Sequence, residues 1–321
     1  MKLFQKFLQK LNGLHYSQEY LCFGYESFEH PLHAWLVSNG HVTKNITKLH
    51  SFVGYQPLII AIASDIETAE TTDVIFSNNV LQPNDLFLQK DAIATLSLKK
   101  IQEQPFLENK ITLYEGCRGK HRFVSSFHQS IIGWHNRLYQ KKPGNVFLPG
   151  NLYKQVQIAY ALPRNISLIT VGQDDRYNLF PTDLHGPAGE DHYIISLRWQ
   201  GKACRQVEQT GKVLVTQIQN DFYRTVYSLG KNHMQEMKGI ENFPFSEAVS
   251  TNYHLPIPLS AIQCQELELQ DSFIYGIHKL MLFKIVSRQV IGDHPSTLSH
   301  IHNVYATWRH NNHLPGNYLL R

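Results

Sequence analysis

The sequence lacks the features that mark several large classes of protein. Its four cysteines lie far apart, at Cys22, Cys117, Cys204 and Cys264, and no CxxC or HExxH pattern is present. This spacing argues against a disulfide framework and favours a reduced chain inside the cell. No GxGxxG loop is present either, so the sequence carries no signature of a dinucleotide-binding Rossmann domain.

Charge and long apolar runs are also scarce. Charged residues make up 17% of the chain, and the net charge is +4, with Lys and Arg scattered along it. We therefore expect no nucleic-acid partner, although this mild positive net charge would suit a small anionic ligand. No apolar run reaches the length of a transmembrane helix, so we expect no membrane partner and a cytoplasmic location. A hydrophobic content of 42% is enough for a buried core.

The N-terminal segment MKLFQKFLQKL places apolar residues at helical spacing, with Lys and Gln between them. It lacks the uninterrupted apolar core and the cleavage site of an export signal. We expect an amphipathic helix that packs on the body of the protein, with attachment to a membrane surface as the alternative.

The chain does contain an internal repeat. LPGN occurs at 148–151 and again at 314–317, and further matches precede both copies in the same order. The paired segments are 47–64 with 182–199, 71–79 with 209–217, 91–101 with 260–269, 119–133 with 276–292, and 134–139 with 301–305. This order predicts a tandem duplication with an insertion near 219–255. We expect two homologous domains, 1–155 (including the N-terminal helix) and 156–321.

The repeated segments predict a mainly β fold. Short runs such as NISLITVG, HYIISLRW, GKVLVTQI and HKLMLFKIV are rich in β-branched and aromatic residues and are bounded by turn residues. GQDDR at 172–176 predicts a hairpin loop. Helices are predicted at 202–211, ending on Gly211, and at 221–230, beginning on Asp221. Many strands with few helices favour a closed β-barrel with short helices.

The second half resembles the flavin reductase-like, FMN-binding split-barrel family. The resemblance runs through ALPRNISLITVGQDDRYNLFPTDLHGP, HYIISLRWQGKACRQVEQTGKVLVTQ and SAIQCQELELQDSFIYGIHKLMLFKIV, and the first half joins it only through the repeat. It implies split barrels that pair as a homodimer with FMN at the interface. A tandem chain would supply both barrels itself as an intramolecular pseudo-dimer, with a further homodimer left open.

The resemblance also implies a site in the second half. The ring of the flavin would lie against the segment NLFPTDLH, which contains Asn178, Phe180, Thr182, Asp183, Leu184 and His185. Its phosphate would meet Ser196, Arg198, Lys202 and Arg205 at a strand end and a helix start. The alternatives are a simple turn before Pro187 and a solvated basic face. The family usually shows Lys-x-Thr and then Asn, and this chain has Cys204 and Val207 at those positions.

Histidines provide the candidate catalytic group. His278 matches the family's histidine before the last long strand, and His121 is its predicted counterpart in the first half. A structural role for both residues is the alternative. His185 and His50 form a second repeated pair. We expect no metal site, because the spacing of His294, His300 and His302 is a weak signal.

The two halves differ in charge at the predicted phosphate site. Asp65, Glu67 and Glu70 stand where the first half would need cations, so its site is predicted to be altered or lost.

Three classes of function follow from these patterns. The first is a flavoprotein oxidoreductase that passes hydride from NAD(P)H to FMN, with FAD as the other candidate flavin. The second is a non-catalytic binder of flavin, haem or another flat ligand. The third is a structural or interaction module.

Overall fold

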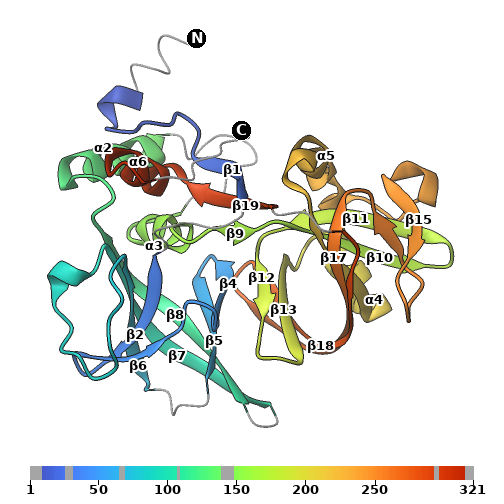
Figure 1. Ribbon diagram of the computed structural model, residues 1–321, viewed down its shortest axis with the longest axis horizontal. Helices are drawn as coiled ribbons and strands as arrows, with labels where there is room; N and C mark the ends of the chain where they lie inside the picture. Colours follow the sequence, from blue (N-terminus) through green and yellow to red (C-terminus); the bar gives the residue numbers. More distant parts are fainter. Residues whose placement is uncertain are drawn as a thin grey trace.

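The computed structural model describes residues 9–25, 32–64, 69–106, 109–138, 148–292 and 296–314. Two large β-sheets lie side by side, one built by the first half and one by the second (Figure 1). The prediction of a mainly β chain is confirmed. Residues 1–8, which hold most of the predicted N-terminal helix, lie outside the described residues.

No helix among the described residues has both the length and the apolar character needed to cross a membrane.

The first half forms a seven-stranded sheet in the order β3-β2-β6-β7-β8-β5-β4. Its strands are β2 (His33–Ser38), β3 (His41–Asn45), β4 (His50–Tyr55), β5 (Leu58–Ser64), β6 (Thr71–Ser77), β7 (Ala94–Phe106) and β8 (Asn109–His121).

The second half forms a seven-stranded sheet in the order β11-β10-β14-β17-β18-β13-β12. Its strands are β10 (Ser167–Gln173), β11 (Arg176–Thr182), β12 (His185–Pro187), β13 (His192–Arg198), β14 (Lys212–Ile218), β17 (Ala261–Tyr275) and β18 (His278–Val290). When the strands of each half are numbered along the chain, the two orders are identical. This identity supports the tandem duplication, which stays a prediction, as do the domain boundaries.

Each sheet is open rather than closed. The outermost strands of the second sheet are β11 and β12, and no ladder joins them among the described residues. The predicted closed barrel is therefore wrong in this respect, and each sheet is a half barrel. The edge of β11 is covered by the insertion, since Tyr177 exchanges both backbone hydrogen bonds with Lys238.

The local turn and cap signals in the second half are confirmed. Asp174 and Asp175 adopt positive φ angles in the two-residue hairpin loop between β10 and β11. Helix α4 (Lys202–Thr210) ends at Gly211, which has a left-handed φ of 65° and donates its N–H to the carbonyl of Val207.

One repeat match is wrong. Residues 119–133 were paired with 276–292, yet His121 ends β8 whereas His278 begins β18. The segment after His121 forms helix α2 (Ser126–Leu138) instead of a strand. Ser125 starts this helix by accepting the N–H of His128. His121 is therefore not the counterpart of His278.

The remaining elements join the halves or belong to the insertion. A three-stranded sheet places β19 between β1 and β9, and so connects the two ends of the chain to the middle. The bounds are β1 (Tyr20–Tyr25), β9 (Arg164–Asn165), β19 (Thr297–His302), η1 (Gln89–Asp91), α3 (Leu152–Ala159), η3 (Asn220–Phe222), α5 (Tyr223–Ser228), η4 (Leu229–Met234), η5 (Ile240–Asn242), β15 (Phe245–Val249), β16 (Pro256–Pro258) and α6 (Asn303–Asn311). The predicted helix at 221–230 is present, but Phe222 rather than Asp221 precedes α5.

The two sheets meet across an apolar junction. Strand β4 of the first half contacts β12, β13 and β18 of the second. One buried cluster contains residues of both halves: Val53, Ile59, Ala61, Ile111, Leu113, Ala188, Ile194, Leu280 and Leu282. Burying each large aliphatic side chain contributes about 1.5–3 kcal/mol, so the halves are held together by hydrophobic packing.

Gly276 lies at this junction, and its substitution by alanine tests how closely the two halves pack. It has a φ of 58°, and a Cβ there would lie 1.9 Å from the carbonyl oxygen of Gln56 in the other half. Gly211 has a similar φ of 65° and nothing within 4 Å of its Cβ position. We expect Gly211→Ala to cost about 1–2 kcal/mol from backbone strain alone. Gly276→Ala should cost roughly 1–3 kcal/mol more, because the junction must also move. Chemical denaturation measures both free energies of unfolding, and equal losses for Gly211→Ala and Gly276→Ala would contradict the close contact.

Candidate functional site

The predicted flavin-binding residues come from five parts of the second half. Strand β11 supplies Asn178, Phe180 and Thr182, and the link to β12 supplies Asp183 and Leu184. His185 begins β12, Ser196 and Arg198 lie at the end of β13, and Lys202 and Arg205 lie in the first turn of α4.

Asn178 and Phe180 are fully buried beneath the insertion. The Nδ2 atom of Asn178 donates to Gln206 Oε1 at 2.7 Å and to the carbonyl of Asn232 at 3.1 Å. The ring of Phe180 lies 4.9 Å from the ring of His233. A ligand can therefore reach either side chain only if η4 moves.

The segment from Thr182 to His185 is held mainly by internal hydrogen bonds. Thr182 Oγ1 accepts the N–H of Leu184 at 3.3 Å, and the side chain of Leu184 is buried. His185 Nε2 lies 3.0 Å from the carbonyl of Asn165, so this nitrogen carries the proton. Its Nδ1 then accepts from the hydroxyl of Tyr193 at 2.6 Å. Burial lowers the pKa of His185 to about 4, which makes it a neutral structural residue at pH 7.

Asp183 is the centre of a polar network that the sequence did not reveal. Its Oδ2 accepts from Tyr160 at 2.9 Å and from His300 Nδ1 at 3.0 Å. Arg164 donates to the carbonyls of Asp183 and Phe52. Burial opposes ionisation, but the hydrogen bond from His300 and the charge of Arg164 hold the pKa of Asp183 well below its usual range. Arg164 stands in ALPRN, where a cation beside a β-strand is too common to signal this role.

His278 lies at the junction with the first half. It is 1% exposed, its Nδ1 lies 3.2 Å from Ser196 Oγ, and its ring meets the ring of Tyr55 edge-on at 4.6 Å. Burial lowers its pKa to about 4, and the charge of Arg198 acts in the same direction. Nε2 has no partner among the described residues. The side chain is neutral at pH 7 and cannot supply a proton as an imidazolium.

Exposed cations surround the start of α4. Arg198 Nη2 donates to the hydroxyl of Tyr55 at 2.8 Å, which links the two halves. Lys202 forms a 2.7 Å ion pair with Glu236. The hydrogen bond and charge of Lys202, together with the charges of Arg205 and Arg176, lower the pKa of Glu236. The chain thus brings several positive charges together around one carboxylate.

Cys204 and Val207, which depart from the family pattern, face the same buried cluster as Phe180. Both are fully buried in the core of the second half. Burial raises the pKa of Cys204 and of Cys264 to about 11, so neither thiol is a nucleophile at pH 7.

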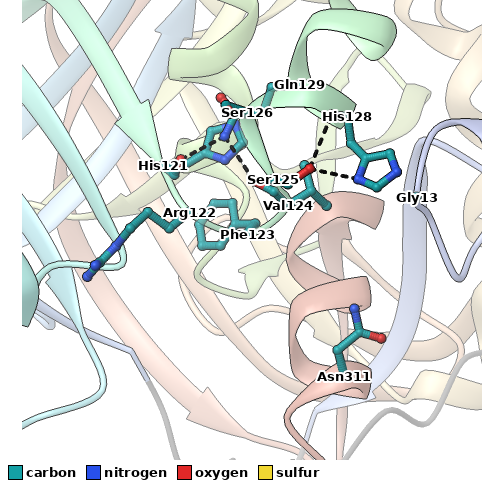
Figure 2. A pocket seen from close by; sticks show the side chains of 10 residues that line it. All are labelled: Gly13, His121, Arg122, Phe123, Val124, Ser125, Ser126, His128, Gln129 and Asn311. Atoms are coloured by element: carbon teal, nitrogen blue, oxygen red, sulfur yellow. Dashed lines mark hydrogen bonds between the residues drawn. The ribbon is translucent and has the colours of Figure 1, made fainter.

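A separate cavity of about 440 Å³ lies in the first half, between the start of α2 and the end of α6 (Figure 2). None of the predicted flavin-site residues of the second half lines it, whereas His121, the predicted counterpart of His278, does. Its residues are Gly13, His121, Arg122, Phe123, Val124, Ser125, Ser126, His128, Gln129 and Asn311.

The described residues contain no group of three or more His, Cys, Asp or Glu that could hold a metal ion. His300 pairs with Asp183, whereas His302 faces Glu19 at 3.6 Å, and His294 lies outside the described residues.

Solved structures that match 40–49% of this chain include flavin reductases and FMN-binding proteins. An NADH:FAD oxidoreductase from Streptomyces globisporus is 10% identical, with a TM-score of 0.41 over 49% of this chain and 94% of its own. An FMN-binding protein from Thermus thermophilus is 18% identical, with a TM-score of 0.36 over 40% and 72%. The flavin reductase component of a bacterial tryptophan halogenase is 11% identical, with a TM-score of 0.39 over 47% and 98%.

No protein-family model and no curated protein matches the sequence. With TM-scores below 0.5, the structural similarities leave the ligand of this chain open.

Proposed function

We propose that the second half binds flavin mononucleotide and that the bound flavin takes hydride from NAD(P)H. The observation that carries this proposal is the cation group at the start of α4, the helix whose Gln206 accepts a hydrogen bond from Asn178 of β11. Flavin mononucleotide needs cations or N–H groups for its phosphate and a flat slot with hydrogen bonds for its ring. The sequence resemblance points to the same segments.

The start of α4 suits a phosphate on electrostatic grounds. Gly201 precedes the helix and no side chain caps it, so its first N–H groups lack a capping acceptor. Arg198, Lys202 and Arg205 lie beside this end. Free N–H groups and nearby cations together favour an anion.

The junction gives this site a contribution from the first half. Tyr55 reaches Arg198 and His278 from β4. This contact supports an intramolecular pseudo-dimer in which the second barrel's site is completed by the first. A further homodimer stays open.

Within this proposal, the flavin supplies the hydride-accepting ring. The protein's own residues would bind and orient it: the cations at the start of α4 would hold the phosphate, and residues 182–186 would hold the ring. His278 acts by positioning Ser196 and Tyr55, since it is neutral and buried.

The first half is not expected to bind a second flavin. In the strand registers, His50 lies opposite Ile62 in the first half, just as His185 lies opposite Ile195 in the second. The next residue after each isoleucine is Ala63 in the first half and Ser196 in the second, so Ala63 takes the place of Ser196. The position matching Arg198 is Asp65, which lies outside the described residues, as does Glu67, whereas Glu70 is exposed. An acidic side chain there would repel phosphate.

The phosphate site predicts a specific loss of affinity. Arg198→Ala combined with Lys202→Ala should weaken FMN binding roughly tenfold or more, because charged hydrogen bonds to phosphate are lost. Riboflavin, which has no phosphate, should lose much less. Fluorescence quenching of each flavin measures both affinities. A control with Lys48→Ala and Lys284→Ala removes two exposed cations elsewhere, and an equal loss there would contradict the site.

A non-catalytic flavin binder is the second candidate, and one observation favours it. His278, the residue predicted to be catalytic, is buried and neutral. Oxidation of NADH in the presence of FMN separates the two functions. Bound flavin without NADH oxidation would establish the binder and rule out the reductase.

A further inference from the structure

Residues 232–238 of the insertion, here called the cover segment, engage Asn178, which is proposed to hold the flavin ring, and two backbone carbonyls beside it on β11. Asn232 Nδ2 donates to the carbonyl of Leu179 at 2.8 Å, and its own carbonyl accepts from Asn178. His233 Nε2 donates to the carbonyl of Pro181 at 2.7 Å. An amide and an imidazole thus occupy the hydrogen-bonding groups of β11.

The same segment engages the groups proposed to hold the phosphate. Glu236 pairs with Lys202, and Arg205 and Arg176 add their charges to the same carboxylate. Its side chain is 72% exposed, so this carboxylate is held by cations at the surface and not by burial. A carboxylate is the side-chain group closest in charge to a phosphate.

We infer that the cover segment is a built-in competitor for the proposed flavin site, with Glu236 in the place of the phosphate and Asn232 and His233 in the place of the ring edge. This inference rests on the proposed function of the second half. Flavin binds by displacing the segment, so its affinity is reduced by the free energy of the contacts that the segment makes.

Protection of a sheet edge explains part of the segment but not all of it. Lys238 pairs with Tyr177 and so covers the edge of β11. Covering the edge of a strand does not require a carboxylate beside cations. The position of Glu236 is therefore not explained by protection of β11.

Glycines lie close to both ends of the segment. Gly239 follows it directly, and Gly230 precedes it by two positions within η4. Met234 on its outer side is 60% exposed.

Glu236→Gln tests the competition directly. Removing this charge should tighten FMN binding roughly two- to fivefold, the range of an exposed ion pair. Riboflavin also displaces the segment, so its binding should tighten by no more than FMN binding does. Glu241→Gln is the matched control, because Glu241 is exposed in the same insertion and its carboxylate accepts from Asn242. Isothermal titration of the full chain with each flavin measures the affinities.

Hydrogen exchange of the full chain supplies the second readout. Adding FMN should speed exchange at the amides of Tyr177 and Lys238, which now donate to each other's carbonyls. If FMN binds the wild type but Glu236→Gln binds no tighter and these amides keep their protection, the competitor is refuted while the flavin site stands. If FMN at millimolar concentration binds neither protein, the proposed function and the competitor both fall.

Discussion

Glu266→Gln should lower the free energy of unfolding by about 3 kcal/mol at pH 7. Glu266 lies fully buried in β17, where its carboxylate accepts the N–H groups of Asn252 and Tyr253. An amide nitrogen in its place would face donors and leave them unpaired. Burial raises the pKa of this carboxyl group, but hydrogen bonds from Ser250, Ser287 and the backbone outweigh it and lower the pKa from 4.5 to about 2.

The sign of the pH dependence follows from this lowered pKa. The stability that Glu266 contributes is complete above its unfolded pKa, near 4.5, and is lost as the pH falls toward 2. The wild type and Glu266→Gln should therefore differ most at pH 7 and converge below pH 3. Urea unfolding across this range measures the difference.

Glu268→Gln is the control, since Glu268 lies on the same strand with an exposed side chain. It should change stability by less than about 0.5 kcal/mol. If the free energies of unfolding of the wild type and Glu266→Gln differed by the same amount from pH 7 to pH 2, the charge of Glu266 would not be the cause of the stability difference.

Asp183→Ala should destabilise the protein by about 3–5 kcal/mol, because it removes one member of a buried charged network. Arg164 would lose the opposite charge beside it, while Tyr160 and His300 would lose their acceptor. His300 also contacts the hydroxyl of Tyr227 in α5. The network therefore ties the insertion to β19 and to the link between β11 and β12.

A double-mutant cycle with His300→Ala separates this network from a general loss of packing. When two residues share a hydrogen bond, the losses in free energy of unfolding from their substitutions do not add. The double variant should therefore be more stable than the sum of the two single losses predicts. Asp221→Asn, an exposed acid in the same insertion, serves as the control. Additive losses for Asp183→Ala and His300→Ala would refute the network.

Sequence reasoning succeeded where short-range chemistry decides the structure. Gly211 ends α4 because only a left-handed residue closes that helix, and Asp174 and Asp175 form the hairpin loop because such residues tolerate positive φ. The strand segments of the second half were identified from their β-branched composition. The histidine match failed because a histidine beside an apolar run looks the same at either end of a strand, as His121 and His278 show.

Long-range contacts account for what the sequence could not predict. Asn178 and Asn232 are 54 positions apart, and Tyr55 and Arg198 are 143 positions apart. Nothing in the composition of the insertion indicates that Asn232 and Glu236 lie on the predicted flavin face. The Arg164 and Asp183 network likewise depends on the junction of the two halves, which propensity and periodicity do not describe.

Equilibrium titration of the full chain with FMN, with riboflavin in parallel, tests the central claim most directly. The account predicts one FMN bound per chain, because only the second half has the cations. FMN should bind more tightly than riboflavin, and its advantage should shrink as salt is added, because the phosphate is held by exposed charges. Two FMN per chain, equal affinities for the two flavins, or no binding at millimolar FMN would contradict the account.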